Sequence, residues 1–331
     1  MKSKETLKVC LKLGLGACLL YYVVYSKMID FHSVGSFLLR PTNLVVALFF
    51  FSFSVLCVTA RWYLLAKAQG LSFSFKSMVE ITMIGYFFNT FMPGAVGGDV
   101  VKAWYVAGEE PKKKTRAIFT VLLDRVIGLS VFFFYSGTTL LFYTDWLRGR
   151  PQLQMTAYVV WGFGGGSILF SLLFYSPLLW RHKGFRRFLH FLERWPFLHK
   201  VMDAAMLYRH HLRSICMALG LSALSIFGMT LFYKWMGDGL GIPMDLAHYF
   251  FVVPIALTVS AVPLLPGGIG VGQVAFFTLF RWSGMSNPEQ GGSLCTAMQV
   301  YNILFNCLGA FFYLKFKKKP QEVRVTNSVP V

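Results

Sequence analysis

The chain has 331 residues, of which 56% are hydrophobic and only 14% charged, and its mean hydropathy is +0.56. Soluble globular proteins typically carry about 25% charged residues, so this composition excludes an ordinary water-soluble domain and indicates a membrane protein. The net charge of +18 resides in short segments between apolar runs, with no soluble domain to present a basic face, so we expect no nucleic-acid partner.

The first half of the chain, residues 1–143, is expected to hold three membrane-spanning helices. Each corresponds to an apolar run near the roughly 20 residues needed to cross the hydrocarbon layer. The N-terminal run is similar to a signal peptide but lacks a small-residue cleavage site, so we interpret it as an uncleaved helix. The three expected spans are 9–27, 43–66 and 117–143.

The second half, residues 144–315, repeats this content with expected spans at 154–177, 212–234 and 293–315. Its basic and aromatic segment 178–211 is expected to lie at the cytoplasmic surface as an amphipathic helix against anionic lipid heads, or to link the two halves. The last residues, 316–331, are expected to form a disordered cytoplasmic tail.

Two further apolar stretches, 77–107 and 246–283, are interrupted at their centres by proline and glycine, which are poor helix formers. We expect each to form a re-entrant hairpin of two half-helices, because broken backbone is tolerated at membrane depth only where protein or water covers it. The interrupting residues are Pro93, Gly94, Gly97 and Gly98 in the first stretch and Pro266, Gly267, Gly268 and Gly270 in the second.

The positions of Lys and Arg support this layout. If the N-terminus is cytoplasmic and both hairpins are re-entrant, 25 basic residues, Arg61 among them, lie on the cytoplasmic side and six on the other. If both stretches crossed fully, the basic segment 178–211 would lie outside. The distribution therefore predicts a multi-pass protein of the cytoplasmic membrane with both termini cytoplasmic.

The order helix, helix, hairpin, helix occurs twice, and three crossings per half would give the halves opposite orientations. Short echoes accompany it: Pro93–Gly97 matches Pro266–Gly270, and Arg61-Trp62 matches Lys234-Trp235. Paired Gly/Pro-broken segments in an inverted repeat are typical of transporters with a midplane site. The alternative is chance similarity between glycine-rich membrane segments.

Four charged residues are expected at membrane depth, where ionisable groups are costly and therefore pair or serve function. We expect Asp99, Lys102 and Arg125 to converge on one cavity beside the helix that carries Asp124. One reading is that the cluster binds cargo, and the other is that it locks helices together. Asn89 and Gln273 flank the two breaks, where they either satisfy freed backbone groups or bind a ligand.

No catalytic or metal-binding pattern is present in the sequence. The six cysteines form no CxxC pair and the seven histidines show no ligand spacing, so we expect no metal site, no disulfide framework and no cofactor. There is also no phosphate-loop motif and no arrangement of Ser, His and Asp that would predict nucleophilic catalysis.

The ordered motifs resemble one family. Asn89-x3-Pro93-Gly94-x2-Gly97-Gly98-Asp99-x2-Lys102, followed by Asp124-Arg125 with Gly128 and then Pro266–Gly270, is similar to the transmembrane region of lysylphosphatidylglycerol synthases and their flippase-like relatives. The resemblance covers residues 8–316. The family usually has Arg where this chain has Lys102, and Glu close to where it has Gln273. Lys102 keeps the positive charge but loses bidentate phosphate recognition, and Gln273 lacks the negative charge of a Glu.

The resemblance implies an all-helical lipid flippase that moves an anionic phospholipid or a polyprenyl-phosphate-linked lipid. The chain ends soon after its last expected helix, so we expect no aminoacyl-transferase domain and no enzymatic activity. Two alternatives stay open: a phosphatidylglycerol aminoacyl transferase, and a non-transporting scaffold for an envelope glycosyltransferase or another envelope-biosynthesis enzyme.

Overall fold

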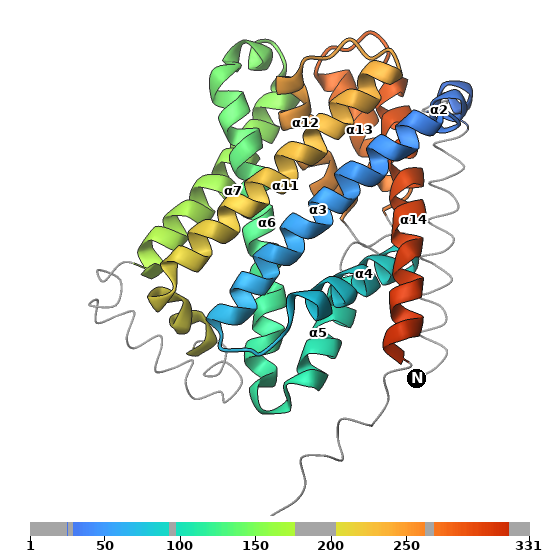
Figure 1. Cartoon of the computed structure of the whole chain (residues 1–331). Coiled ribbons are helices and arrows are strands. Elements are labelled where there is room, and N and C mark those ends of the chain that lie inside the picture. The colour runs from blue at the N-terminus through green and yellow to red at the C-terminus, as the bar shows by residue number, and fades with distance from the viewer. Residues whose placement is uncertain (1–24, 26–28, 93–96, 176–202, 262–267, 318–331) are drawn as a thin grey trace, which may run out of the picture.

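The computed structural model describes residues 25, 29–92, 97–175, 203–261 and 268–317, and in this part of the chain every regular element is helical. The α-helices are α2 (Phe31–Leu38), α3 (Pro41–Ala68), α4 (Phe75–Phe91), α5 (Gly97–Glu109), α6 (Lys114–Phe142), α7 (Pro151–Tyr175), α11 (Leu212–Gly239), α12 (Leu246–Ser260), α13 (Val271–Trp282) and α14 (Glu289–Lys317) (Figure 1). Short 3-10 turns occur at Pro111–Lys113, Thr144–Leu147 and Tyr208–His210.

Four helical segments in the described residues are long and apolar enough to cross a membrane: Pro41–Ala68, Pro111–Phe142, Leu212–Gly239 and Glu289–Lys315. They coincide with four of the predicted spans, which confirms a polytopic all-helical membrane protein. The 25-residue helix α7 occupies the position of a fifth predicted span. The sixth, at 9–27, lies outside the described residues, as do most of the segment 178–211 and nearly all of the tail.

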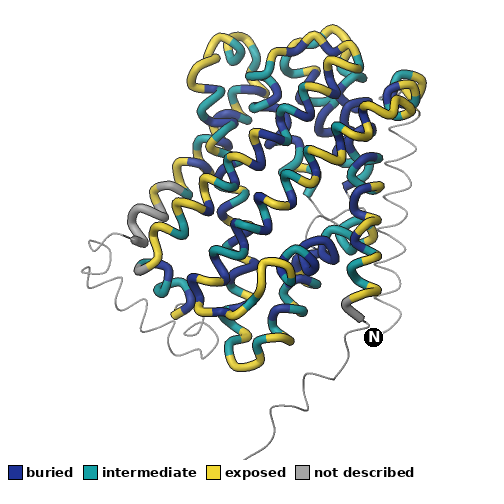
Figure 2. The backbone as a smooth tube through the Cα atoms, in the orientation of Figure 1, coloured by how far each residue is buried: buried dark blue, intermediate teal, exposed yellow. Residues whose placement is uncertain are grey.

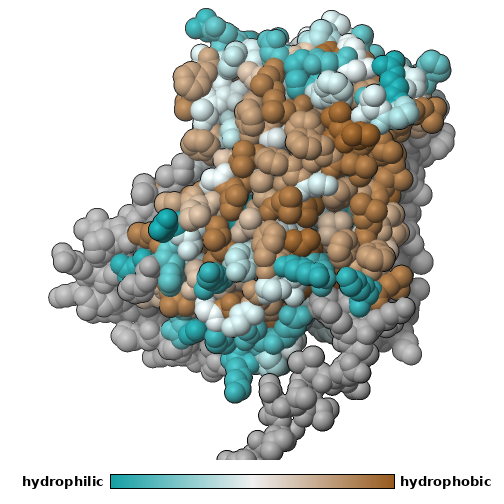
Figure 3. Space-filling model, viewed as in Figure 1, coloured by the Kyte–Doolittle hydropathy of each residue, from teal (hydrophilic) through white to brown (hydrophobic). Residues whose placement is uncertain are grey.

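The surface carries a broad apolar band between two polar ends (Figure 3). Large apolar side chains on the outer faces of the long helices are exposed, including Phe49, Leu122 and Phe311 at 64%, 58% and 67%. An apolar exterior of this extent is what hydrocarbon requires. The buried residues lie instead along the faces where helices meet, as Figure 2 shows for α3, α4 and α11.

The two interrupted stretches form hairpins, as the sequence predicted. Helices α4 and α5 pack against each other at one end of the bundle, and α12 and α13 pack against each other at the opposite end (Figure 1). The four half-helices have 17, 13, 15 and 12 residues, fewer than the roughly 20 needed to span the hydrocarbon layer. Each half-helix is therefore too short to cross the hydrocarbon layer alone.

The helix ends that precede the hairpins are built alike. Helix α3 is followed by Gly70 with φ +67°, and α11 by Gly241 with φ +71°, a left-handed conformation that favours glycine. In both cases the glycine N–H and the next N–H donate back to carbonyl groups of the last helical turn, which is a Schellman motif. The following helices α4 and α12 begin five residues after these glycines.

Helix packing follows the same duplication. Helices α3 and α11 pack directly against each other and share a hydrogen bond of 2.9 Å between Ser54 and Ser225. Helix α14 packs on α4 of the first hairpin, and α6 packs on α12 of the second. Each hairpin thus lies beside the long helix that follows the other hairpin.

Candidate functional site

An ion pair joins the first hairpin to helix α6. Asp99 lies in the first turn of α5, where the positive end of the helix dipole stabilises a carboxylate, and its Oδ2 accepts from Nε of Arg125 on α6. The Asp99 side chain is 11% exposed, whereas that of Arg125 is 46% exposed. The expected meeting of Asp99 and Arg125 is therefore present, and the arginine is the more accessible partner.

Asp124 has a different partner, Arg61 of α3, which the count of basic residues had placed on the cytoplasmic side. Arg61 donates to both Asp124 oxygens, at 2.6 and 2.8 Å, and its Nη1 donates to Ser222 of α11 at 2.6 Å. Both charged side chains are 8% exposed. The structure instead carries Arg61 inside the bundle, because α3 continues for seven residues beyond it and packs on α6 and α11.

The Arg61–Asp124 pair has the features of a helix lock. A bidentate guanidinium–carboxylate pair is a strong, directional contact, and here it joins three helices in the interior. Gly128 provides the space, since a methyl group there would lie 3.1 Å from Arg61 Nη1. The lock reading therefore applies to Asp124, while Arg125, the adjacent residue, points to the first hairpin.

Lys102 is a buried cation with aromatic neighbours. It is 5% exposed, and its Nζ lies 5.4 Å from the ring centre of Trp62 and 5.2 Å from that of Tyr86. Attraction between a cation and an aromatic face is stronger when both are desolvated. No carboxylate of the described residues lies within ion-pair distance of Lys102, so Lys102 and Asp99 do not pair directly.

The break in the first hairpin is closed by Asn89 and two glycines. Asn89 Oδ1 accepts from the backbone N–H of Gly98 at 2.6 Å, which satisfies a free donor at the start of α5. A side chain at Gly98 would collide with the carbonyl oxygen of Gly85 on α4. The half-helices cross so closely that only glycine fits at this point.

The break in the second hairpin is closed by neutral side chains. Gln273 Oε1 accepts from the N–H of Gly270 at 2.7 Å, and its Nε2 donates to Gln299 and Thr296 of α14 at 2.7 and 3.2 Å. Gln299 in turn donates to the carbonyl of Gly268 at 3.4 Å. Gln273 thus satisfies backbone and amide groups within the protein.

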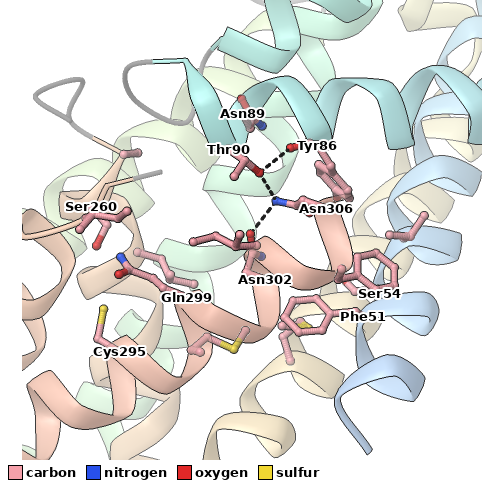
Figure 4. Close-up of a pocket in the computed structure, with 18 of the residues that line it drawn as sticks. Phe51, Ser54, Tyr86, Asn89, Thr90, Ser260, Cys295, Gln299, Asn302 and Asn306 are labelled. Atoms are coloured by element: carbon pink, nitrogen blue, oxygen red, sulfur yellow. Dashed lines mark hydrogen bonds between the residues drawn. The ribbon is translucent and has the colours of Figure 1, made fainter. Parts of the chain in front are cut away.

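A cavity of about 360 Å³ lies between the two breaks (Figure 4). Its wall comes from both hairpins and from helices α3, α6, α11 and α14. Arg125 is the one charged residue among its described lining residues. The polar lining residues are Ser54, Tyr86, Asn89, Thr90, Arg125, Tyr233, Ser260, Cys295, Gln299, Asn302 and Asn306.

The structure brings only some of the predicted site residues to this cavity. Asn89 and Arg125 line it, whereas Asp99, Lys102 and Gln273 lie behind the lining. Each of these three contacts a lining residue: Arg125, Tyr86 and Gln299, respectively. Four predicted residues, Pro93, Gly94, Pro266 and Gly267, lie outside the described residues. Gly97, Gly98, Gly268 and Gly270 form the described edges of the two breaks.

Sequence reasoning missed Arg61 and the polar face of α14. Arg61 was counted among the cytoplasmic charges because it lies near the end of an apolar run that is already almost long enough to span. Gln299, Asn302 and Asn306 are spaced by three and four residues, so they share one helix face. Three amides on one face of an otherwise apolar spanning segment were the available signal.

Comparison with known proteins agrees with this architecture. The family model described as lysylphosphatidylglycerol synthase TM region matches residues 9–309. The UPF0104 membrane protein MJ1595 of Methanocaldococcus jannaschii is 31% identical to the chain over 80 residues. That stretch is 24% of either protein, so the match spans about a quarter of this relative's length.

Proposed function

The chain belongs to the lysylphosphatidylglycerol synthase TM-region family, and from this premise we propose that it moves a lipid with an anionic, phosphate-bearing head between the leaflets of the membrane. A polar head cannot cross hydrocarbon unaided, so the transporter must offer it a polar path at membrane depth while the acyl or prenyl chains stay in lipid. The cargo class comprises anionic phospholipids and polyprenyl-phosphate-linked lipids.

The observation that carries the proposal is the cavity between the two hairpin breaks. Its volume of about 360 Å³ falls within the range of small-molecule sites, which is roughly 300–1,000 Å³. Nearly half of the Arg125 side chain is exposed, and this side chain lines the cavity. A guanidinium in a low-dielectric site attracts phosphate strongly and can bind two of its oxygens at once.

The charge balance around the cavity favours an anion. Within the cluster that joins α3, α5 and α6, Asp99 and Asp124 supply two negative charges and Arg61, Lys102 and Arg125 supply three positive ones. Glu80, also buried, lies outside this cluster, six residues before Tyr86 on α4. Lys102 is the cation without a described carboxylate partner, and it lies against Tyr86, which lines the cavity. The excess positive charge would be offset by a bound phosphate.

An inverted repeat is part of the proposal, because alternating access in many transporters rests on two halves of opposite orientation. The matching Schellman motifs, the exchanged packing of α6 and α14, and the opposite ends at which the hairpins lie all support it. The shift between the halves is 171 residues at Gly70 and Gly241, and Ser54 bonds to Ser225, which is also 171 residues away. Such a self-contact is what a two-fold axis between α3 and α11 would produce.

Purified protein in vesicles with fluorescent head-labelled lipids tests the proposal. Wild type should raise the rate at which labelled phosphate-bearing lipids leave the inner leaflet and become accessible to a membrane-impermeant quencher. Arg125→Gln should reduce that rate about tenfold or more, since hydrogen bonds to charged groups contribute about 1.5–3 kcal/mol. No acceleration across a broad panel of anionic lipids would overturn the proposal.

A double variant separates cargo binding from a purely structural cluster. Asp99→Asn with Lys102→Gln leaves the net charge unchanged but removes the carboxylate partner of Arg125, so the yield of monodisperse protein is measured first to establish that folding and insertion persist. If these residues serve only to hold helices, transport should also persist. We expect transport to be lost, because both substitutions alter the electrostatic field that attracts the phosphate to the cavity wall at the first hairpin.

A further inference from the structure

Helix α14 presents a row of amide side chains to the cavity. Gln299, Asn302 and Asn306 all line it, and Thr90 of the first hairpin joins the row from the opposite wall (Figure 4). Asn306 Nδ2 donates to Asn302 Oδ1 at 2.7 Å and to Thr90 Oγ1 at 3.1 Å. The row therefore connects α14 to the first hairpin, which carries Asp99 and stands next to Arg125.

Part of this row's hydrogen-bonding capacity is unused within the described residues. Asn302 Nδ2 and Asn89 Nδ2 have no described acceptor, and Asn306 Oδ1 has no described donor. These atoms are also absent from the fully buried groups that lack a partner, so each keeps some accessible surface. The cavity thus offers both amide donors and an amide acceptor beyond the guanidinium.

The mixture of donors and acceptors restricts the chemistry of a bound head. A phosphate only accepts hydrogen bonds, so it uses Arg125 and leaves the Asn306 acceptor unpaired. An ammonium group only donates, and the described lining contains no carboxylate to receive it, since Asp99 and Asp124 lie outside the lining, paired with Arg125 and Arg61. A hydroxyl both donates and accepts, so adjacent hydroxyls satisfy neighbouring amides.

We propose that the α14 amide row selects a phosphate-bearing lipid whose head also carries free hydroxyls, such as glycerol or a sugar, over a bare phosphate and over a cationic aminoacyl head. This rests on the proposed function for the phosphate subsite at Arg125. The shared chemistry is a phosphate with adjacent hydroxyls, which a glycerophospholipid and a polyprenyl-phosphate glycolipid both provide.

Lipid binding to the detergent-purified full chain tests the selection without requiring transport. Native mass spectrometry or lipid-dependent thermal stabilisation would compare phosphatidylglycerol with phosphatidic acid and with lysylphosphatidylglycerol. A second pair, a polyprenyl-phosphate sugar and the bare polyprenyl phosphate, identifies which lipid source is preferred. In each pair that binds at all, wild type should bind the hydroxyl-bearing lipid about fivefold to tenfold more tightly than the lipid with the bare phosphate.

Asn302→Leu should abolish that preference while phosphatidic acid binding is kept. Gln290→Leu is the matched control, because it removes an amide from the same helix at a position outside the cavity lining. Asn302→Asp adds a second readout that does not depend on hydrophobic replacement, since an acidic group should shift binding toward the cationic lysyl lipid.

The outcomes separate this inference from the proposed function. Equal binding of phosphatidylglycerol and phosphatidic acid by wild type, or tightest binding of the lysyl lipid, would overturn the selection even if both lipids are transported. Selective binding that Asn302→Leu removes supports it even if vesicles show no transport, in which case the flippase proposal fails alone. A preference that survives Asn302→Leu and Asn306→Leu together would also reject the row as its source.

Discussion

The two hairpins share an outline but differ in chemistry. Each follows a helix that ends in a Schellman motif, and each breaks near the centre of the bundle. At each break a carboxamide oxygen accepts a hydrogen bond from a backbone N–H. The carboxamide belongs to Asn89 in the first hairpin and to Gln273 in the second. The first hairpin carries Asp99 and Lys102 and contacts Arg125, while the second is held by Gln273, Gln299 and Thr296.

The difference extends to the helix before each hairpin. The structural shift of 171 residues places Phe232 at the position equivalent to Arg61, not Lys234 as the sequence echo had suggested, and Phe232 is fully buried among aromatic rings. The first half therefore uses a buried ion pair where the second uses packing. A shared helical frame can thus hold buried charges in one half alone, which makes the first half the expected source of phosphate affinity, while the second half contributes the neutral α14 amides.

Arg61→Leu should produce the largest loss of stability of the changes considered. It leaves Asp124 buried without its partner, and breaking a buried pair in this way costs about 3–5 kcal/mol. Thermal denaturation in detergent and the yield of monodisperse protein would measure the loss. Phe232→Leu is the matched change in the second half and should cost less, because no charge is left unpaired.

Removing the pair as a unit sharpens the same comparison. Arg61→Leu together with Asp124→Leu should recover most of the stability lost in the single variant, since apolar replacement of a buried ion pair is often neutral. A double variant as unstable as Arg61→Leu alone would mean that the hydrogen bond from Arg61 to Ser222 matters more than the charges.

Gly98→Ala should destabilise more than Gly272→Ala, and these two glycines are the second residues of α5 and α13. At Gly98 the new methyl group meets backbone of α4, whereas at Gly272 it meets the side-chain ends of Cys295, Ser260 and Gln299 at 2.8–3.1 Å. Overpacking against backbone costs about 1–3 kcal/mol because the half-helices must separate. Equal melting temperatures for the two variants would show that the first crossing is looser than described.

Gly70→Ala and Gly241→Ala should have the smallest effects, and these effects should be equal. Both glycines adopt positive φ in the same motif, and a side chain in that conformation costs about 1–2 kcal/mol. Neither position is near the charged cluster. Clearly unequal losses in thermal stability would argue that the two halves are not equivalent even where their backbones match.

The sequence allowed most of the fold to be predicted and part of the site. Long apolar runs and Gly/Pro breaks are local features, so four of the spans and the two broken stretches could be located from them. The pairing of Arg61 with Asp124 could not, because it depends on how far α3 continues and how α3 and α6 rotate. Asn302 and Asn306 were overlooked because neutral amides hardly interrupt an apolar run, although their spacing placed them on one face.

The Arg61–Asp124 contact also has a consequence for biosynthesis. Arg61 emerges from the ribosome 63 residues before Asp124 and 161 residues before Ser222. A lone arginine costs about 2.5–3.5 kcal/mol at the centre of an inserting helix and less toward its end. Arg61 lies seven residues before the end of α3, so insertion of α3 carries part of this cost until α6 arrives. Membrane integration of this protein should therefore be cooperative across helices, with a nascent chain that ends before Asp124 retained by the insertion machinery or degraded.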